Sequence, residues 1–166
     1  MQTLEQLFSG QLLGVSKLKL SCGLKEFPKE ILDLSETLEY LDLSGNELSK
    51  LPFEFSKLKK LKIAFFSNNL FTEFPKVLGE CPMLDIVGFK ANKINYVASE
   101  SLSPSLRWLI LTDNLINEIP ASIATCKPMQ KLMLAGNQLT DLPKEMAQLE
   151  NLQLLRISAN NFQELP

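Results

Sequence analysis

A spacing of 23 residues recurs along this chain and constrains its fold more than any other feature. Residues 129–143 read MQKLMLAGNQLTDLP, with LRWLILTDNLINEIP 23 residues earlier and LQLLRISANNFQELP 23 residues later. A leading apolar residue, called position 1, marks seven such units, with spacings of 23 residues and one of 22. These residues are Val15, Leu38, Leu61, Leu84, Leu106, Met129 and Leu152. Such a period indicates repeated units stacked along one axis.

Within each unit the apolar residues at positions 4 and 6 alternate with other residues, as Leu109 and Leu111 do in the fifth. Alternation with a period of two predicts a strand with both side chains on one face. Proline stands at position 15 of most units, with Ala98 as the exception. Because proline ends regular pairing, we expect the chain to turn there and return along the back of the unit.

Position 9 carries asparagine in six units, and Cys22 takes that place in the first, whose loop is one residue shorter. Buried backbone groups at a sharp turn need partners, and an amide side chain offers two donors and an acceptor. We therefore expect a ladder of asparagines that joins the turns of adjacent units. Its members are Asn46, Asn69, Asn92, Asn114, Asn137 and Asn160, together with Cys22.

This pattern resembles the leucine-rich repeat, L-x-x-L-x-L-x-x-N/C-x-L, over nearly the whole chain. The resemblance implies an α/β fold, a curved right-handed solenoid with parallel strands on its concave face and short helical or 3₁₀ segments on its convex face. The expected organisation is a capping helix over residues 1–14 and seven repeats over 15–166, the last one incomplete. The repeats begin at residues 15, 38, 61, 84, 106, 129 and 152.

Composition argues against several classes of function. A net charge of −2 and a pI of about 5.3 disfavour nucleic acid as the main partner, since phosphate binding requires a basic face. The N-terminus does not read as a secretory signal, and no apolar run approaches the length of a membrane span. We therefore expect a cytoplasmic protein without a membrane partner, unless a leader precedes these residues.

Catalytic and metal-binding signals are weak. The chain has no histidine, which removes the usual activating base for a serine or cysteine nucleophile and the commonest metal ligand. Cys81 and Cys126 occupy position 21, where other repeats carry leucine, so we expect both in the core. We predict no catalytic residue, no cofactor and no metal site in these 166 residues.

Three departures from the regular pattern carry expectations of their own. Thr3 to Gln6 reads as a capping box, which predicts a short helix that covers the first repeat. The fourth repeat is one residue short, which indicates either a tolerated loop variant or a local change of curvature. The chain stops at Pro166 without a polar cap, so we expect either a longer protein or a contact at this end; the oligomeric state stays open.

The side chains at positions 3 and 5 of each repeat point away from the core, and we expect them on the concave face. The middle of this face is apolar and its ends are basic, although the scaffold itself does not require apolar residues there. We predict that these residues bind a protein or peptide, with cover by another part of the protein and no role at all as the alternatives. They are Tyr40, Ile63, Phe65, Ile86, Trp108, Ile110 and Met133, flanked by Lys17, Lys19, Lys131 and Arg156.

A closer resemblance is to the N-terminal region of bacterial leucine-rich-repeat protein kinases. It rests on LKLSCGLKEFP (18–28), LRWLILTDN (106–114) and QKLMLAGN (130–137). The motifs of a kinase domain are missing, so the resemblance implies a recognition module for signalling rather than an activity of this chain. The alternatives are the recognition domain of a secreted bacterial effector and a stand-alone scaffold.

Overall fold

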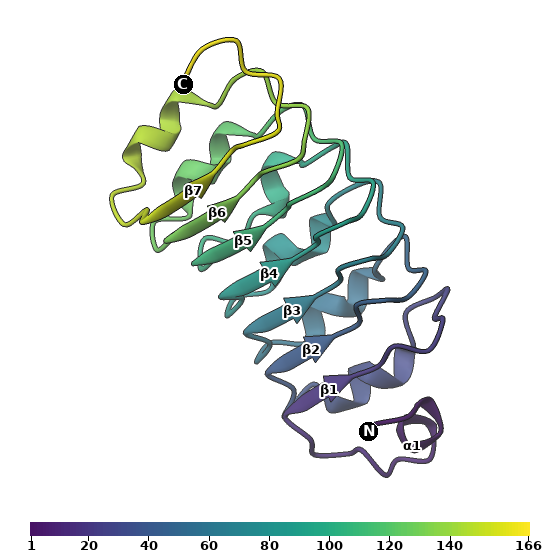
Figure 1. Cartoon of the computed structure of the whole chain (residues 1–166). Helices are drawn as coiled ribbons and strands as arrows, with labels where there is room; N and C mark the ends of the chain where they lie inside the picture. The colour runs from purple at the N-terminus through teal and green to yellow at the C-terminus, as the bar shows by residue number, and fades with distance from the viewer.

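The computed structural model describes residues 1–166 and contains one seven-stranded parallel sheet, with the strands in chain order (Figure 1). A short helix, α1 (Leu4–Phe8), precedes the strands. The strands are β1 (Lys17–Lys19), β2 (Tyr40–Asp42), β3 (Ile63–Phe65), β4 (Ile86–Gly88), β5 (Trp108–Ile110), β6 (Lys131–Met133) and β7 (Leu154–Arg156). This arrangement confirms the predicted solenoid.

Short 3₁₀ helices alternate with the strands and lie on the opposite side of the molecule (Figure 1). Five of the six begin directly after the proline at position 15, which is the N-cap residue of the helix. The ring of proline restricts φ to a value that is compatible with this N-cap position. They are η1 (Lys29–Leu34), η2 (Phe53–Lys57), η3 (Lys76–Glu80), η4 (Ser99–Ser101), η5 (Ala121–Thr125) and η6 (Lys144–Gln148).

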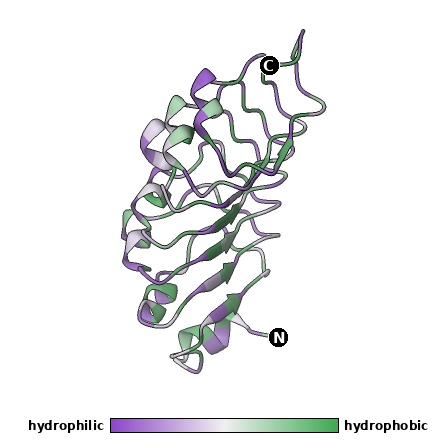
Figure 2. Ribbon diagram, turned by 90° about the vertical axis from the view of Figure 1, so that its left-hand side faces the viewer, coloured by the Kyte–Doolittle hydropathy of each residue, from purple (hydrophilic) through white to green (hydrophobic).

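The core lies between the sheet and the 3₁₀ helices. Adjacent strands pair in step, so that Leu18 lies beside Leu41 and Leu109 beside Leu132, and all four side chains are buried. Phe66 and Phe89 stack at 4.9 Å between ring centroids, with Phe71 edge-on to both. Figure 2 shows apolar residues in the strands of successive repeats, mixed with hydrophilic ones near the N-terminus.

The asparagines at position 9 form a continuous ladder. Asn92 illustrates the pattern: its amide donates to the carbonyls of Phe66 (2.9 Å) and Phe89 (3.0 Å) and accepts from the N–H of Phe71 (3.1 Å). Asn46, Asn69, Asn114, Asn137 and Asn160 make the same three kinds of bond. Each side chain therefore joins the turns of two repeats.

Cys22 does not continue this ladder, contrary to the expectation from its place in the pattern. Its side chain is exposed and makes no hydrogen bond, whereas its backbone N–H donates to Asn46 Oδ1 at 3.0 Å. The first loop is one residue shorter, the Cys22 thiol lines a hollow beside the N-terminal segment, and the backbone of Cys22 uses the next asparagine instead.

The residue before each ladder asparagine adopts a left-handed backbone conformation, a constraint that the sequence pattern only partly displays. Gly45 and Gly136 have φ of 73° and 72°, which glycine tolerates freely. Asn68 and Asp113 also have positive φ, and Asn and Asp adopt the left-handed region more readily than most residues. Ala91 (58°) and Ala159 (53°) have neither advantage, so both hold strained backbone.

Replacing Ala91 with glycine is expected to raise the free energy of unfolding by up to about 1.5 kcal/mol. The left-handed conformation costs an L-residue about 1–2 kcal/mol, from which the greater chain entropy of unfolded glycine subtracts about 0.5–1 kcal/mol. Urea unfolding followed by circular dichroism measures the change. Ala135→Gly is the matched control, because Ala135 lacks a positive φ and should only lose stability. Equal losses in both variants would contradict this explanation.

The N-terminal segment closes the first repeat. Thr3 and Gln6 form the predicted capping box, and Leu7 and Leu12 are buried in the core. The side chain of Gln2 also donates to the Lys17 carbonyl and accepts from the Lys19 N–H, both at 2.8 Å. A side-chain amide thus pairs with the free edge of β1, as a neighbouring strand would.

The sheet continues without a change of register through the shortened fourth repeat. Ile86 of this repeat pairs with Ile63 on one side and with Trp108 on the other. The missing residue is accommodated on the back, where η4 has only three residues and lies against Gly79 of η3. Buried Ser103 donates to the Cys81 carbonyl at 3.0 Å and ties this segment to the previous repeat. The shortening is therefore compensated locally.

The seventh repeat is less covered than the others. Leu155 at its position 4 is 37% exposed, whereas Leu132 at the same place in the sixth repeat is fully buried. None of the helices is long and apolar enough to cross a membrane.

Candidate functional site: the concave face of the sheet

The side chains at positions 3 and 5 form two rows that cross the strands on the concave face, opposite the 3₁₀ helices. The strand register aligns the members of each row. The first row is Lys17, Tyr40, Ile63, Ile86, Trp108, Lys131 and Leu154. The second row is Lys19, Asp42, Phe65, Gly88, Ile110, Met133 and Arg156. The structure thus brings all the predicted partner-binding residues onto one surface.

Exposure differs along these rows. Tyr40, Phe65 and Trp108 are half-buried, and so are Ile63, Ile110, Met133 and Lys131. Lys17, Lys19 and Arg156 are exposed at the two ends. The surface is therefore a continuous apolar strip with basic ends.

Ile86 was predicted to be accessible to a partner, but its side chain is buried. It is only 8% exposed, although it lies outside the core cluster behind the sheet. Its in-register neighbours are Ile63 on one side and Trp108 on the other, so it lies between an aliphatic and a large aromatic side chain. Ile86 thus supports the floor of the strip, and its neighbours offer the contact area.

Phe65 and Gly88 fit together in a way that the pattern did not indicate. A Cβ added to Gly88 would lie 2.8 Å from Phe65 Cδ1, so the ring occupies space that only glycine leaves free. Phe65 also packs edge-on against Tyr40, with ring centroids 5.9 Å apart. Edge-to-face packing of this kind holds both rings in place. The strip consequently presents fixed aromatic surfaces instead of mobile side chains.

A lysine lies over an aromatic ring near each end of the first row. Lys17 Nζ is 5.7 Å from the centroid of Tyr40, and Lys131 Nζ is 4.2 Å from that of Trp108. Neither lysine has a carboxylate partner, whereas Lys19 has Asp42 at 3.9 Å. Cation–π contacts at exposed sites are weak, so both ammonium groups remain available to a stronger anionic partner.

Trp108 also contacts Arg107 at position 2, where two ion pairs that the repeat pattern did not predict join neighbouring repeats. The Arg107 guanidinium lies 5.1 Å from the Trp108 ring and donates twice to Asp85, at 2.9 Å each. This hydrogen bonding raises the pKa of Arg107. Glu39 and Lys62 pair in the same way at 2.8 Å, and that bond lowers the pKa of Glu39. The charge at position 2 alternates between negative and positive in the second to fifth repeats, and this pattern could have predicted the two ion pairs.

The indole N–H of Trp108 is buried and has no hydrogen-bond acceptor. A buried donor without a partner costs about 1–3 kcal/mol. Within the protein, the Trp108 ring is therefore held by its contacts with Arg107 and Lys131 and not by a hydrogen bond.

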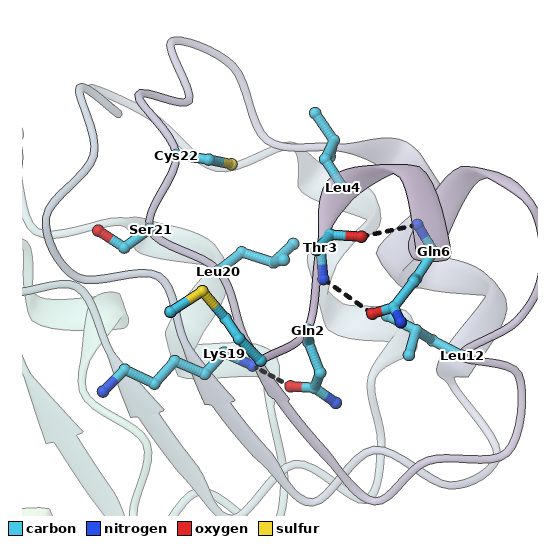
Figure 3. Close-up of a pocket in the computed structure, with 10 residues that line it drawn as sticks. Gln2, Thr3, Leu4, Gln6, Leu12, Lys19, Leu20, Ser21 and Cys22 are labelled. Carbon is cyan, nitrogen blue, oxygen red and sulfur yellow. Dashed lines mark hydrogen bonds between the residues drawn. The ribbon is translucent and has the colours of Figure 1, made fainter.

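Apart from the concave strip, the molecule has a hollow between the N-terminal segment and the first repeat (Figure 3). Its volume is about 780 Å³, and its walls are mainly apolar, including Leu4, Leu12 and Leu20. Cys22 lines it with an exposed thiol. Its polar residues Gln2, Thr3 and Gln6 already hydrogen-bond to one another or to β1, so its chemistry specifies no ligand.

The other two cysteines are buried, as predicted. Burial raises the pKa of the Cys81 thiol to about 12 and that of the Cys126 thiol to about 11. Both therefore stay protonated and unreactive at neutral pH. No group of three or more Cys, Asp or Glu side chains is gathered as a set of metal ligands.

Comparisons with known proteins agree with this geometry. Two family models match the chain, one described as Leucine rich repeat over residues 104–162 and one as Leucine Rich Repeat over residues 37–58. Together with the seven in-register strands, these matches decide the family. The chain is a leucine-rich repeat protein.

Its relatives are longer. Receptor-like protein 15 of Arabidopsis thaliana is 33% identical over 118 residues, which is 66% of this leucine-rich repeat protein and 12% of the relative. The leucine-rich repeat protein LIC12759 of Leptospira interrogans has a TM-score of 0.71 and 34% identity, covering 94% of this chain and 46% of that one. The plant peptide hormone receptor RGFR1, solved in complex with RGF2, has a TM-score of 0.72 and 27% identity, covering 89% and 28%.

Proposed function

We propose that this protein is an interaction module that binds a protein or peptide on the concave face of its sheet. The observation that carries the proposal is the apolar strip of half-exposed side chains around Tyr40, Phe65 and Trp108. The fold does not need apolar residues there, because positions 4 and 6 already fill the core. A contiguous apolar patch of this kind usually marks an interaction site, and Tyr and Trp are common anchors.

The similarity to a receptor solved with a peptide hormone gives independent support for a peptide or protein ligand. The chain spans 28% of that receptor, so the receptor's own ligand is not carried over. The half-buried state of the anchors also favours binding, since the rings are already ordered and lose little conformational freedom when a partner covers them.

Selection from a phage-displayed library of random dodecapeptides tests the proposal. Trp108→Ala and Phe65→Ala are each expected to weaken selected peptides by about 2 kcal/mol if these rings are anchors. Phe53→Ala is the matched control, because Phe53 is 78% exposed on η2, on the opposite side of the molecule. Circular dichroism must show that all three variants remain folded. Peptide binding that survives both concave-face substitutions would refute the proposal.

The wider context of the module is also a proposal. The resemblance of residues 18–28, 106–114 and 130–137 to bacterial leucine-rich-repeat kinases favours a recognition part of a signalling protein in the cytoplasm, with no catalytic activity in these residues. A secreted effector or a stand-alone scaffold is the alternative. The intact mass of the native protein, its motifs beyond residue 166 and cell fractionation would separate these contexts.

A further inference from the structure

The two ends of the concave strip carry the same chemistry, and this symmetry bears on the kind of partner. Lys17 on β1 and Lys131 on β6 stand in the same row, with Lys19 and Arg156 beside them in the second row. Between the ends lie Tyr40, Ile63, Phe65, Trp108, Ile110 and Met133. Asp42 is the one acidic residue in either row, and it is already engaged by Lys19 and the Ser44 N–H.

We infer that the partner is an extended peptide segment that crosses the strands, with apolar residues in its middle and an acidic residue near each end. This inference rests on the proposed function and specifies the ligand of the same face. Charge complementarity selects acidic ends, because both unpaired lysines are cations without carboxylates.

The spacing of the lysines sets the length of the segment. Five strand intervals separate β1 from β6, which corresponds to about 24 Å at roughly 4.8 Å per interval. The two ammonium groups lie over rings from β2 and β5, which are three intervals or about 14 Å apart. An extended chain advances about 3.3 Å per residue, so about four to seven residues separate the two acidic side chains. Such a segment places about three to six apolar or small residues over the strip.

Each lysine already marks the position of an acidic group. The ammonium groups lie over Tyr40 and Trp108, so a carboxylate that binds either lysine sits at the edge of an aromatic anchor. Acidic and apolar contacts are therefore made together at both ends.

The same dodecapeptide selection tests this specificity with a different readout. Enriched sequences are expected to carry two acidic residues about four to seven positions apart, with aromatic or aliphatic residues between them. Synthetic versions should quench or shift the emission of Trp108, the single tryptophan of the chain, and should bind more weakly as salt rises. The double variant Lys17→Glu, Lys131→Glu should bind them about ten-fold more weakly or worse.

A charge exchange provides the control. Peptides with lysines in place of the two acidic residues should bind the double variant better than the original protein. Lys57→Glu, Lys127→Glu is the matched surface variant, since both residues lie away from the strands, and it should leave binding unchanged.

The outcomes separate the two proposals. Selected peptides that lose binding in Trp108→Ala but lack acidic ends, or are indifferent to Lys17 and Lys131, overturn this inference and leave the proposed function standing. Failure to enrich any peptide, or binding that ignores Trp108→Ala and Phe65→Ala, overturns the proposed function and this inference with it.

Discussion

Replacing Asn92 with alanine is expected to lower the free energy of unfolding by about 3 kcal/mol. The two carbonyls that Asn92 contacts most closely each keep a second asparagine, because Asn69 also donates to Phe66 and Asn114 to Phe89. The N–H of fully buried Phe71 has no such reserve and loses its side-chain acceptor. One orphaned buried donor costs about 1–3 kcal/mol, and two lost hydrogen bonds add about 1 kcal/mol each at most.

Urea unfolding of Asn92→Ala measures this loss. Asn95→Ala is the matched control, because Asn95 is exposed and its side chain makes no hydrogen bond. Asn160→Ala should cost less than Asn92→Ala, since Asn160 is only partly buried and water can reach the groups it leaves. Equal losses for Asn92 and Asn160 would mean that burial does not govern the strength of the ladder.

Gly79→Ala is the second large effect, with an expected loss of about 3 kcal/mol. A Cβ at Gly79 would overlap the carbonyl group of Glu100, which is backbone and cannot rotate away. The segments η3 and η4 would have to separate, at a cost of about 1–3 kcal/mol or more for overpacking. The φ of Gly79 is not positive, so the penalty is steric.

The other repeats supply the control for Gly79→Ala. The corresponding residues are Ser56, Ala124 and Ala147, so a Cβ is tolerated wherever the following repeat has its full length. Ala147→Gly exchanges the same two residue types in the opposite direction and should cost no more than about 1 kcal/mol. A Gly79→Ala protein of unchanged stability would show that η4 can move away freely.

Much of the fold follows from periodicity. The alternation at positions 4 and 6 located all seven strands, and the repeated asparagine located the ladder that joins them. The capping box at Thr3 and the burial of Cys81 and Cys126 were also predictable, because each depends on residue type at a known place in the repeat.

The candidate site was predictable to a lesser degree. Strand alternation placed its residues on one face, but it did not foresee that Ile86 would be covered or that Phe65 would lie over Gly88. It also did not reveal that Gln2 would pair with the edge of β1. These features depend on the size and direction of side chains that meet only after the repeats stack.

The repeat, its strands and the face on which each side chain lies follow from the amino-acid pattern alone, since they depend on local backbone periodicity. Which of those side chains remain accessible depends on how the repeats pack together. Ile86 is buried by neighbours about 23 residues away in each direction, and Cys22 is exposed by a loop one residue shorter than the rest. Accessibility arises from contacts between repeats, and a pattern within one repeat does not contain them.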